Sequence, residues 1–326
     1  MTDSGWVYPL GSCGTTGFEV SISDAIDGWQ HTGLSVARLA AGETRELTLA
    51  DVECVVVPLS GSVQVDTVVT ADATRTTRHA ELAGRASVFA GPTDVAYVPR
   101  GSRLTITGGV AGCRVALATA KAGKSAAAQH FRHLAATEVP VELRGAGQSS
   151  REVRNFGVPG VLDADSIIAC EVITPAGNWS SYPPHKHDTE RAGVEFELEE
   201  IYYFQTQLAA GMPAGAGADP VGYQRVYGTD ERPIDVLAEV RTGDVVLVPH
   251  GWHGPAMAVP GYDLYYLNVM AGPGPERAWL ICDDPAHGWI RATWAGQLLD
   301  PRLPLRQSGA GDATGIASDD NPGGNR

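Results

Sequence analysis

Hydrophobic residues occur along most of the chain in short runs, and glycine and proline interrupt these runs at close intervals. The 326 residues include 39 glycines and 21 prolines, and few stretches repeat with the period of a helix. Short apolar runs bounded by turn residues are typical of strands in all-β sandwiches and barrels. We therefore expect an all-β protein, with a turn at Leu59-Ser60-Gly61 and strands at 53–65, 95–99, 110–119, 167–174, 200–206, 222–227, 244–249 and 262–269.

One pattern occurs twice in the chain. Residues 94–101 read DVAYVPRG and residues 244–251 read DVVLVPHG, so both contain D-V-x-x-V-P-x-G. A repeated unit of this kind indicates an internal duplication, and therefore two barrels of the same type. We expect an N-terminal barrel in residues 1–130, a C-terminal barrel in 131–306, a surface linker at 143–151 (LRGAGQSSR) and a disordered tail at 307–326.

The composition excludes several classes of function. The chain is 43% hydrophobic and 19% charged, and it has neither a run of about 18 apolar residues nor an N-terminal leader pattern. The formal net charge of −14 argues against nucleic acid as a partner, because phosphate groups require a basic surface. The five cysteines are scattered without a C-x-x-C pair, as expected for reduced thiols. We expect a cytoplasmic protein that binds neither nucleic acid nor a membrane.

Histidine carries the strongest chemical signal. Four of the nine histidines fall in two clusters, PPHKHD at 183–188 and PHGWHGP at 249–255. Alternate residues of a strand point to the same side, so His185 and His187 can both face a barrel interior. Glu200 opens the apolar run EIYYF, and His253 follows a Pro-Gly turn. Three imidazoles and one carboxylate form a generic site for a divalent metal ion.

The order of these residues resembles the paired metal motifs of cupins. The strings YPPHKHD, EEIYYF, GYQRVYGTDERPIDVLAEVRTGDVVLVPHGWHGP and GYDLYYLNVMAGP are further similar to the 5-deoxy-glucuronate isomerases of myo-inositol catabolism. The resemblance extends from Gly28 to Trp294 and is densest from residue 180 onward. It implies a bicupin with two jelly-roll barrels and one divalent ion, Zn first, with Mn, Fe, Ni or Co as alternatives. The implied reaction converts 5-deoxy-glucuronate, a small uronic acid, to 5-dehydro-2-deoxy-gluconate. We also expect a homo-oligomer.

Two of the expected ligand positions have rivals nearby. Glu200 is preferred because it directly precedes the apolar strand, as the glutamate ligand of the family does, but twelve residues separate it from His187. The rivals within that interval are Glu190, Glu195, Glu197 and Glu199. His250 competes with His253, although His250 lies within the turn itself. The first half has no His-x-His pair before Glu53, and the residues directly after Gly101, Ser102-Arg103-Leu104, include no histidine, so we expect it to be metal-free.

An aldose–ketose isomerisation moves a proton between neighbouring carbons, and a positioned base is needed for that step. Glu200, Tyr227 and Asp263 are the candidate catalytic residues, and a metal-bound hydroxide or a hydride shift remains an alternative. A buried substrate carboxylate needs a cation. Arg225 is the first choice because it would share an inward strand face with Tyr223 and Tyr227. The other expected substrate contacts are Lys186 and Tyr265.

Two other functions are compatible with a cupin. A dioxygenase uses similar ligands with a redox metal and requires oxygen. A non-catalytic sugar-binding bicupin keeps the fold without turnover. The complete ligand set argues against the second of these alternatives, and the polar residues on nearby strands argue against the first.

Overall fold

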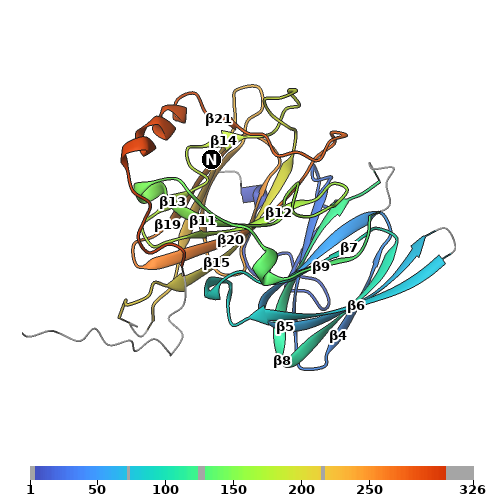
Figure 1. Ribbon diagram of the computed structural model, residues 1–326. Helices are drawn as coiled ribbons and strands as arrows, with labels where there is room; N and C mark the ends of the chain where they lie inside the picture. The colour runs from blue at the N-terminus through green and yellow to red at the C-terminus, as the bar shows by residue number, and fades with distance from the viewer. Residues whose placement is uncertain (1–3, 72–73, 124–128, 214–216, 306–326) are drawn as a thin grey trace, which may run out of the picture.

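The computed structural model describes residues 4–71, 74–123, 129–213 and 217–305, and its regular structure is almost entirely β (Figure 1). The expected tail at 307–326 lies outside these residues. The 3-10 helices are η1 (Ser4–Trp6), η2 (Val88–Ala90), η3 (Ala136–Glu138), η4 (Gly147–Ser149) and η5 (Gly288–Gly296). No helix in the described part of the chain is long and apolar enough to cross a membrane. The expected all-β bicupin class is confirmed.

The first half forms one eight-stranded sheet that bends around its own core. Its strands are β2 (Val20–Ile22), β3 (Thr32–Leu39), β4 (Thr44–Leu49), β5 (Val52–Ala71), β6 (Thr74–Arg85), β7 (Val95–Val98), β8 (Ser102–Lys121) and β9 (Arg132–Leu134). The turn expected at Leu59-Ser60-Gly61 is wrong, because β5 runs through it as a single strand. The β5–β8 pairing shifts register there instead, and such bulges bend a strand without ending it.

The second half has two sheets that face each other. The seven-stranded sheet contains, in spatial order, β1 (Val7–Tyr8), β18 (Val245–Val248), β15 (Glu199–Leu208), β20 (Tyr262–Ala271), β12 (Ile168–Thr174), β11 (Arg151–Gly157) and β10 (Val141–Arg144). The six-stranded sheet contains β17 (Asp235–Val240), β16 (Gly222–Tyr227), β19 (Trp252–Ala258), β14 (His185–Lys186) and β21 (Cys282–Asp283), with β13 (Trp179–Ser180) paired to β19.

The pairing between strands follows the internal duplication. Within the shared D-V-x-x-V-P-x-G pattern, Val98 corresponds to Val248. Cys54 pairs with Val98 in the first half, and Glu200 pairs with Val248 in the second. Cys54 is therefore the counterpart of Glu200, and by the same register Glu53 is the counterpart of Glu199.

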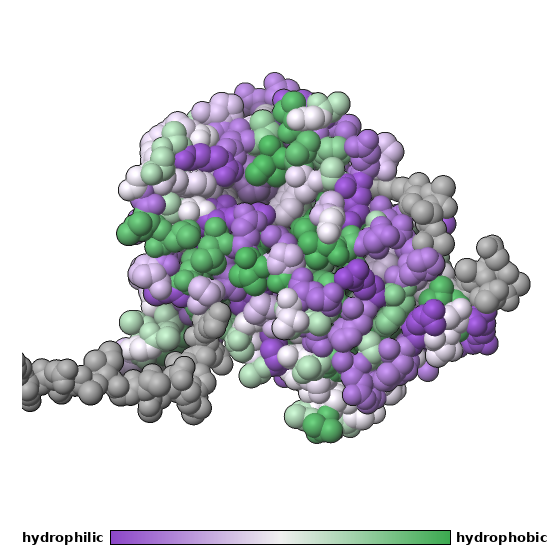
Figure 2. Space-filling model, in the orientation of Figure 1, coloured by the Kyte–Doolittle hydropathy of each residue, from purple (hydrophilic) through white to green (hydrophobic). Residues whose placement is uncertain are grey.

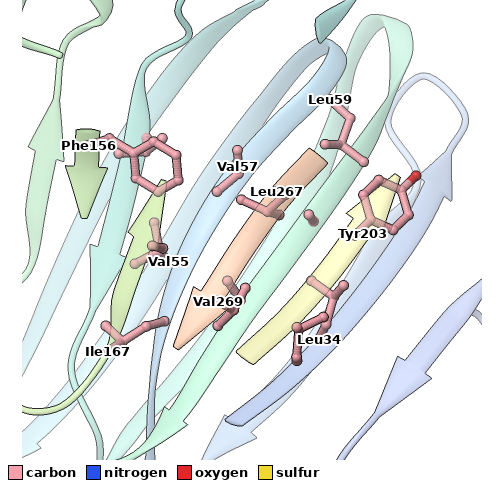
Figure 3. Packing of buried hydrophobic residues seen from close by; sticks show 14 of the residues in the cluster. Leu34, Val55, Val57, Leu59, Phe156, Ile167, Tyr203, Leu267 and Val269 are labelled. Atoms are coloured by element: carbon pink, nitrogen blue, oxygen red, sulfur yellow. The ribbon is translucent and has the colours of Figure 1, made fainter. Parts of the chain in front are cut away.

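The two halves pack back to back around a shared hydrophobic core. Side chains from β3, β5 and β8 of the first half interdigitate with side chains from β12, β15 and β20 of the second, as Figure 3 shows for Leu34, Val55, Val57, Tyr203, Leu267 and Val269. Two further clusters fill the interior of each barrel separately. Since alternate strand residues face opposite sides, β15 and β20 each supply both the shared core and the interior of the second barrel.

Strands also cross the boundary expected at residue 130. β9 pairs with β7 of the first half although it lies beyond that boundary, and β1 at the start of the chain pairs with β18 of the second half. The surface linker expected at 143–151 is wrong as well. This segment contains the end of β10, the 3-10 helix η4 and the first residue of β11.

Candidate metal centre

Two short strands bring the histidine motifs together. β14 pairs antiparallel with β19, and their register places His185 directly opposite His253. Residues that face each other in this way have adjacent side chains, and the two imidazole centroids are 4.5 Å apart. His187 follows β14, and its ring centroid lies 4.6 Å from that of His253. One ring nitrogen from each histidine lies within 4.8 Å of the others, and all three side chains are buried.

Backbone carbonyl groups orient all three imidazoles. The Nδ1 atoms of His185, His187 and His253 lie 3.3, 3.0 and 3.2 Å from the carbonyl oxygens of Pro183, Leu198 and Gly251, respectively. A carbonyl can only accept, so each Nδ1 donates, and Nε2 is left as the nitrogen that can bind a ligand. Burial and the neighbouring imidazoles of His253 and His187 lower the pKa of His185 well below its usual range, which keeps this ring neutral.

Glu200 reaches the histidines from the opposite sheet. Its Oε2 atom lies 3.0 Å from His187 Nε2 and 3.1 Å from His253 Nε2, and the side chain is buried. Burial alone would raise the pKa of Glu200, but the adjacent imidazoles of His187 and His253 outweigh it and hold the pKa at about 2. The carboxylate is thus ionised at neutral pH and supplies one negative charge among three imidazoles.

The rival glutamates have other partners. Glu199 points away from the histidines and accepts hydrogen bonds from the backbone of Gln30, His31 and Thr32 in the first half. Glu195 is buried against Lys186. Glu190 and Glu197 are exposed. Only Glu200 among these five carboxylates lies beside the imidazoles.

The arrangement fits a divalent metal ion. His253 Nε2 is buried and makes no hydrogen bond, because Glu200 Oε2 is near it but not aligned for one. A buried imidazole nitrogen without a partner is costly unless another ligand binds it. Three imidazole nitrogens within 4.8 Å of one another, with the Glu200 carboxylate 3.0 and 3.1 Å from two of them, are a donor set that suits Zn and other first-row divalent ions.

The candidate centre opens onto a cavity of about 470 Å³. His185 and Glu200 line one part of it, and Tyr202 and Tyr266 continue the wall beside them. The two tyrosine hydroxyls lie 3.0 and 3.1 Å from Ser181 Oγ. Much of the remaining wall comes from the β10–β11 hairpin and the C-terminal segment, including Arg144, Arg151, Trp279, Arg291 and Trp294.

Two of the residues expected to contact substrate face the wrong side of their strands. The inward orientation of Arg225 is incorrect, because β16 buries Gly222, Gln224 and Val226 and leaves the alternate residues partly exposed. The Arg225 guanidinium pairs with Asp235 on the neighbouring strand instead. Tyr265 faces the core between the two halves, where its hydroxyl donates to Glu171, and its neighbour Tyr266 is the residue that lines the cavity.

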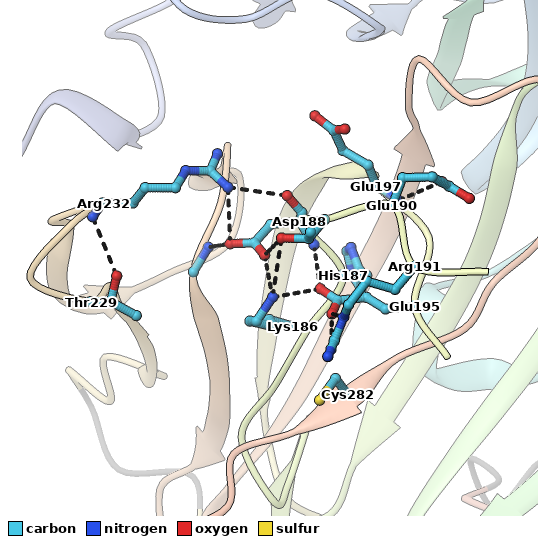
Figure 4. A network of polar contacts seen from close by, with 12 residues as sticks. Lys186, His187, Asp188, Glu190, Arg191, Glu195, Glu197, Thr229, Arg232 and Cys282 are labelled. Atoms are coloured by element: carbon cyan, nitrogen blue, oxygen red, sulfur yellow. Dashed lines mark hydrogen bonds and ion pairs between the residues drawn. The ribbon is translucent and has the colours of Figure 1, made fainter. Parts of the chain in front are cut away.

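Lys186 lies in a network of ions on the outer side of β14 (Figure 4). Its Nζ atom donates to Asp188 and, at 2.7 Å, to the buried Glu195, and it lies 5.6 Å from the centre of the Trp252 ring. Asp188 also accepts from the backbone of Gly251. The network therefore links the two histidine motifs to each other, and Lys186 is absent from the cavity wall.

The other two expected catalytic groups also lie outside the cavity wall. The Tyr227 hydroxyl donates to Asp284. Asp263 lies near the opposite end of β20 from Met270, which pairs with Glu200. Both oxygens of Asp263 are used, one by the backbone of Ala176 and one by Gln207. Of the three candidates from the sequence, only Glu200 reaches the cavity.

Comparisons with known proteins agree with this architecture. Residues 8–290 match the model of the KduI/IolB family. A protein of Geobacillus kaustophilus named 5-deoxy-glucuronate isomerase is 38% identical over 285 residues, covering 87% of this chain and 94% of that protein. A protein of the same name from Listeria monocytogenes is 35% identical, with 84% and 92% covered.

Solved structures extend the comparison. The crystal structure of an IolB-like protein from Salmonella typhimurium is similar with a TM-score of 0.74 and 33% identity, covering 87% of this chain and 98% of that one. An oxalate decarboxylase of Lactobacillus farciminis has a TM-score of 0.56 at 12% identity over 81% of this chain and 82% of its own, and it shares the fold alone. From its sequence, its fold and the arrangement of its histidines, the chain belongs to the KduI/IolB family.

Proposed function

We propose that this protein is a metal-dependent aldose–ketose isomerase that converts 5-deoxy-glucuronate to 5-dehydro-2-deoxy-gluconate. The observation that carries the proposal is the buried group of His185, His187, His253 and Glu200 beside a cavity with three arginines in its wall. This combination supplies a place for a polarising ion and a place for an anionic sugar. The names of the relatives from Geobacillus and Listeria support the same reaction.

In this proposal the four residues hold one divalent ion, with Zn as the first choice. Such an ion, when bound, polarises the carbonyl and neighbouring hydroxyl oxygens of the sugar as a Lewis acid. Glu200 Oε2 lies 3.0 and 3.1 Å from the Nε2 atoms of His187 and His253, so this carboxylate lies among the nitrogens that would bind the ion. We therefore assign Glu200 to binding rather than to proton transfer.

Tyr202 and Tyr266 act as hydrogen-bond donors in the cavity. Burial raises the pKa of both phenols, that of Tyr266 to about 12, so both keep their protons at neutral pH. Their hydroxyls meet at Ser181 Oγ, and the ring of Tyr202 lies 6.1 Å from that of His253. A donor in this position can stabilise negative charge that develops on a substrate oxygen during isomerisation.

The decisive experiment is an assay of 5-deoxy-glucuronate isomerisation without oxygen, carried out in D₂O on protein of known metal content. We expect turnover without oxygen and incorporation of solvent deuterium, because an enediol route exchanges the migrating proton with water. Turnover without deuterium would indicate a hydride shift instead. A strict requirement for oxygen would favour a cupin dioxygenase, and binding of the sugar without turnover would favour a non-catalytic bicupin.

We propose further that the enzyme is cytoplasmic and homo-oligomeric. Scattered free cysteines support a reducing compartment. Large apolar side chains that remain exposed in the second half, among them Trp289, Leu298 and Leu237, support contact with another copy. Figure 2 shows apolar residues gathered over the second half on one face, whereas the surface of β4 and β6 is mostly hydrophilic. Light scattering tests the assembly.

A further inference from the structure

Arg151 is a buried cation in the wall of the cavity that holds His185 and Glu200. It begins β11, and only 8% of the residue is exposed. Val153, two residues later on the same strand face, belongs to the hydrophobic interior of the second barrel. The guanidinium is therefore on the inner face of the sheet, where a charge without a counter-ion is expensive.

Arg151 has no carboxylate partner among the described residues. Its direct contacts there are one hydrogen bond of 3.0 Å from Nη1 to the backbone oxygen of Ser149 and a contact with the ring of Trp294. The Glu142 carboxylate attracts it only from beyond ion-pair distance and is itself paired with Arg144. Other buried arginines, in contrast, form ion pairs with carboxylates. Arg85 pairs with Glu171, and Arg154 pairs with Glu152 at 2.7 Å. A buried arginine that lacks such a partner indicates that an anion from outside the chain completes the site.

Further positive charge surrounds Arg151. Arg144 lies directly opposite it on β10, and like charges in that position repel. Arg291 approaches the same Trp294 ring at 5.4 Å. Burial and these two arginines lower the pKa of Arg151 to about 10. Arg144 and Arg291 are themselves paired, with Glu142 and Asp283, and their side chains are 33% and 38% exposed, so Arg151 is the deepest and least compensated of the three.

We propose that Arg151 binds the carboxylate of the substrate and selects uronic acids over neutral sugars. The cavity wall contains His185 and Glu200 as well as Arg151, so a sugar whose reacting carbonyl lies at the histidines can present its far carboxylate to Arg151. The planar guanidinium can donate two parallel hydrogen bonds to a carboxylate. The unpaired indole Nε1 of Trp279, buried in the same wall, is a further donor. This assignment rests on the proposed function, because it takes the sugar acid as the ligand.

The test separates binding of the charge from catalysis. Kd is measured for D-glucuronate and for D-glucose, and kcat/KM for 5-deoxy-glucuronate and for its neutral counterpart 5-deoxy-glucose, in the metal-loaded wild-type protein and in Arg151→Met and Arg151→Lys. We expect Arg151→Met to raise Kd for D-glucuronate and to lower kcat/KM for 5-deoxy-glucuronate, each by about 10- to 100-fold. The values for the neutral sugars should be unchanged. Arg151→Lys retains the charge without the planar fork, so we expect an intermediate loss.

Arg241→Met is the matched control, because the ion pairs of Arg241 with described residues are those with Asp219 and Glu239 at the surface. It should retain the wild-type preference for the acid. Metal content and melting temperature are measured on every variant. If Arg151→Met does not fold, the preference for acid over neutral sugar is compared between Arg151→Lys and the wild type.

Each outcome decides a different point. Equal losses for acid and neutral sugar, or no loss of preference, would overturn the role of Arg151 even if wild-type isomerisation is observed. A wild-type protein that binds D-glucuronate no better than D-glucose would overturn it too. If Arg151 variants lose the preference in binding while the wild type does not isomerise the uronate, Arg151 stands as the carboxylate site and the proposed function fails.

Discussion

At the scale of single residues, two neighbouring histidines have very different surroundings. His253 is 1% exposed and lies within the three-histidine group, whereas His250 is partly exposed and outside that group. We predict that His253→Ala removes most of the bound metal and abolishes activity, because it deletes one of the four donors. His250→Ala should retain most of both. Elemental analysis of the two variants, with folding checked by circular dichroism, measures the difference, and the reverse ranking would contradict the assignment.

Arg225 gives a second prediction at this scale. Its guanidinium pairs with Asp235 on the outer face of the second barrel, and both side chains are partly exposed. A surface ion pair contributes about 0–1 kcal/mol to the free energy of unfolding. We predict that Arg225→Met keeps kcat/KM for the uronate within about twofold of the wild type, because the change is remote from the cavity. A loss of ten-fold or more with unchanged stability would restore Arg225 as a substrate contact.

The sequence predicted the candidate metal-binding residues better than the residues of the cavity wall. His185, His187, Glu200 and His253 occur in motifs whose spacing is characteristic, and the structure brings these four together. For aromatic and basic residues on strands, a shift of one position reverses the face. The sequence therefore predicts Tyr265 as a substrate contact, whereas its neighbour Tyr266 is the residue that lines the cavity. Arg151 was missed because glycines and serines surround it, and such a segment is typical of a linker.

At the scale of strands, two glutamates join the halves in equivalent ways. Glu53 at the start of β5 accepts from the backbone N–H groups of residues 165–167, just before β12. Glu199 at the start of β15 accepts from those of residues 30–32, at the entry to β3. Glu53 and Glu199 are counterparts in the duplication, so each half donates three backbone N–H groups to the equivalent glutamate of the other half. Glu199 also precedes Glu200, so this contact helps to fix the position of that carboxylate.

We predict that Glu199→Ala lowers the free energy of unfolding by about 3 kcal/mol, because it removes the acceptor of three backbone N–H groups, one of them buried, and of the buried Thr32 hydroxyl. Glu199→Ala should also weaken metal binding, because the contact of Glu199 with residues 30–32 helps to fix the position of the neighbouring Glu200 carboxylate. Glu197→Ala is the matched control. Glu197 is exposed, and we expect a change within about 0.5 kcal/mol. Denaturant unfolding of the metal-free proteins measures both. Similar values for the two variants would show that the contact between the halves contributes little.

Strand positions were easier to predict than strand lengths. Apolar runs located β7, β12, β15, β16, β18 and β20 to within a few residues. β5 and β8 are twenty residues each, because bulges near Gly61 let β5 bend without ending. Gly61 has a φ of +74°, and a Cβ there would lie 2.2 Å from the carbonyl oxygen of Gly112. In the sequence, a glycine required by such a close contact of two strands cannot be distinguished from a glycine in a turn.

At the scale of the whole molecule, duplication and specialisation occur together. The first half keeps the pairing of β5 with β7 but has Cys54 where the second half has Glu200. Cys54 is fully buried, and burial together with Glu53 raises the pKa of its thiol, which opposes the thiolate form that binds metal. By alignment of the repeated pattern, Arg103 occupies the position of His253. A cation and a buried thiol are a poor donor set for a metal ion. The side chains of the first barrel instead form a large shared core with the second.

We therefore predict about one divalent ion per chain, bound only by the second barrel. Elemental analysis of the protein after equilibration with excess Zn and removal of free metal should give one equivalent. His185→Ala should lose it, and Cys54→Ala should retain it. Because an ion that binds only the folded state raises its stability, removal by a chelator should lower Tm, and returning the ion should restore it. Two equivalents in the wild type, or loss of metal in Cys54→Ala, would place a second site in the first barrel.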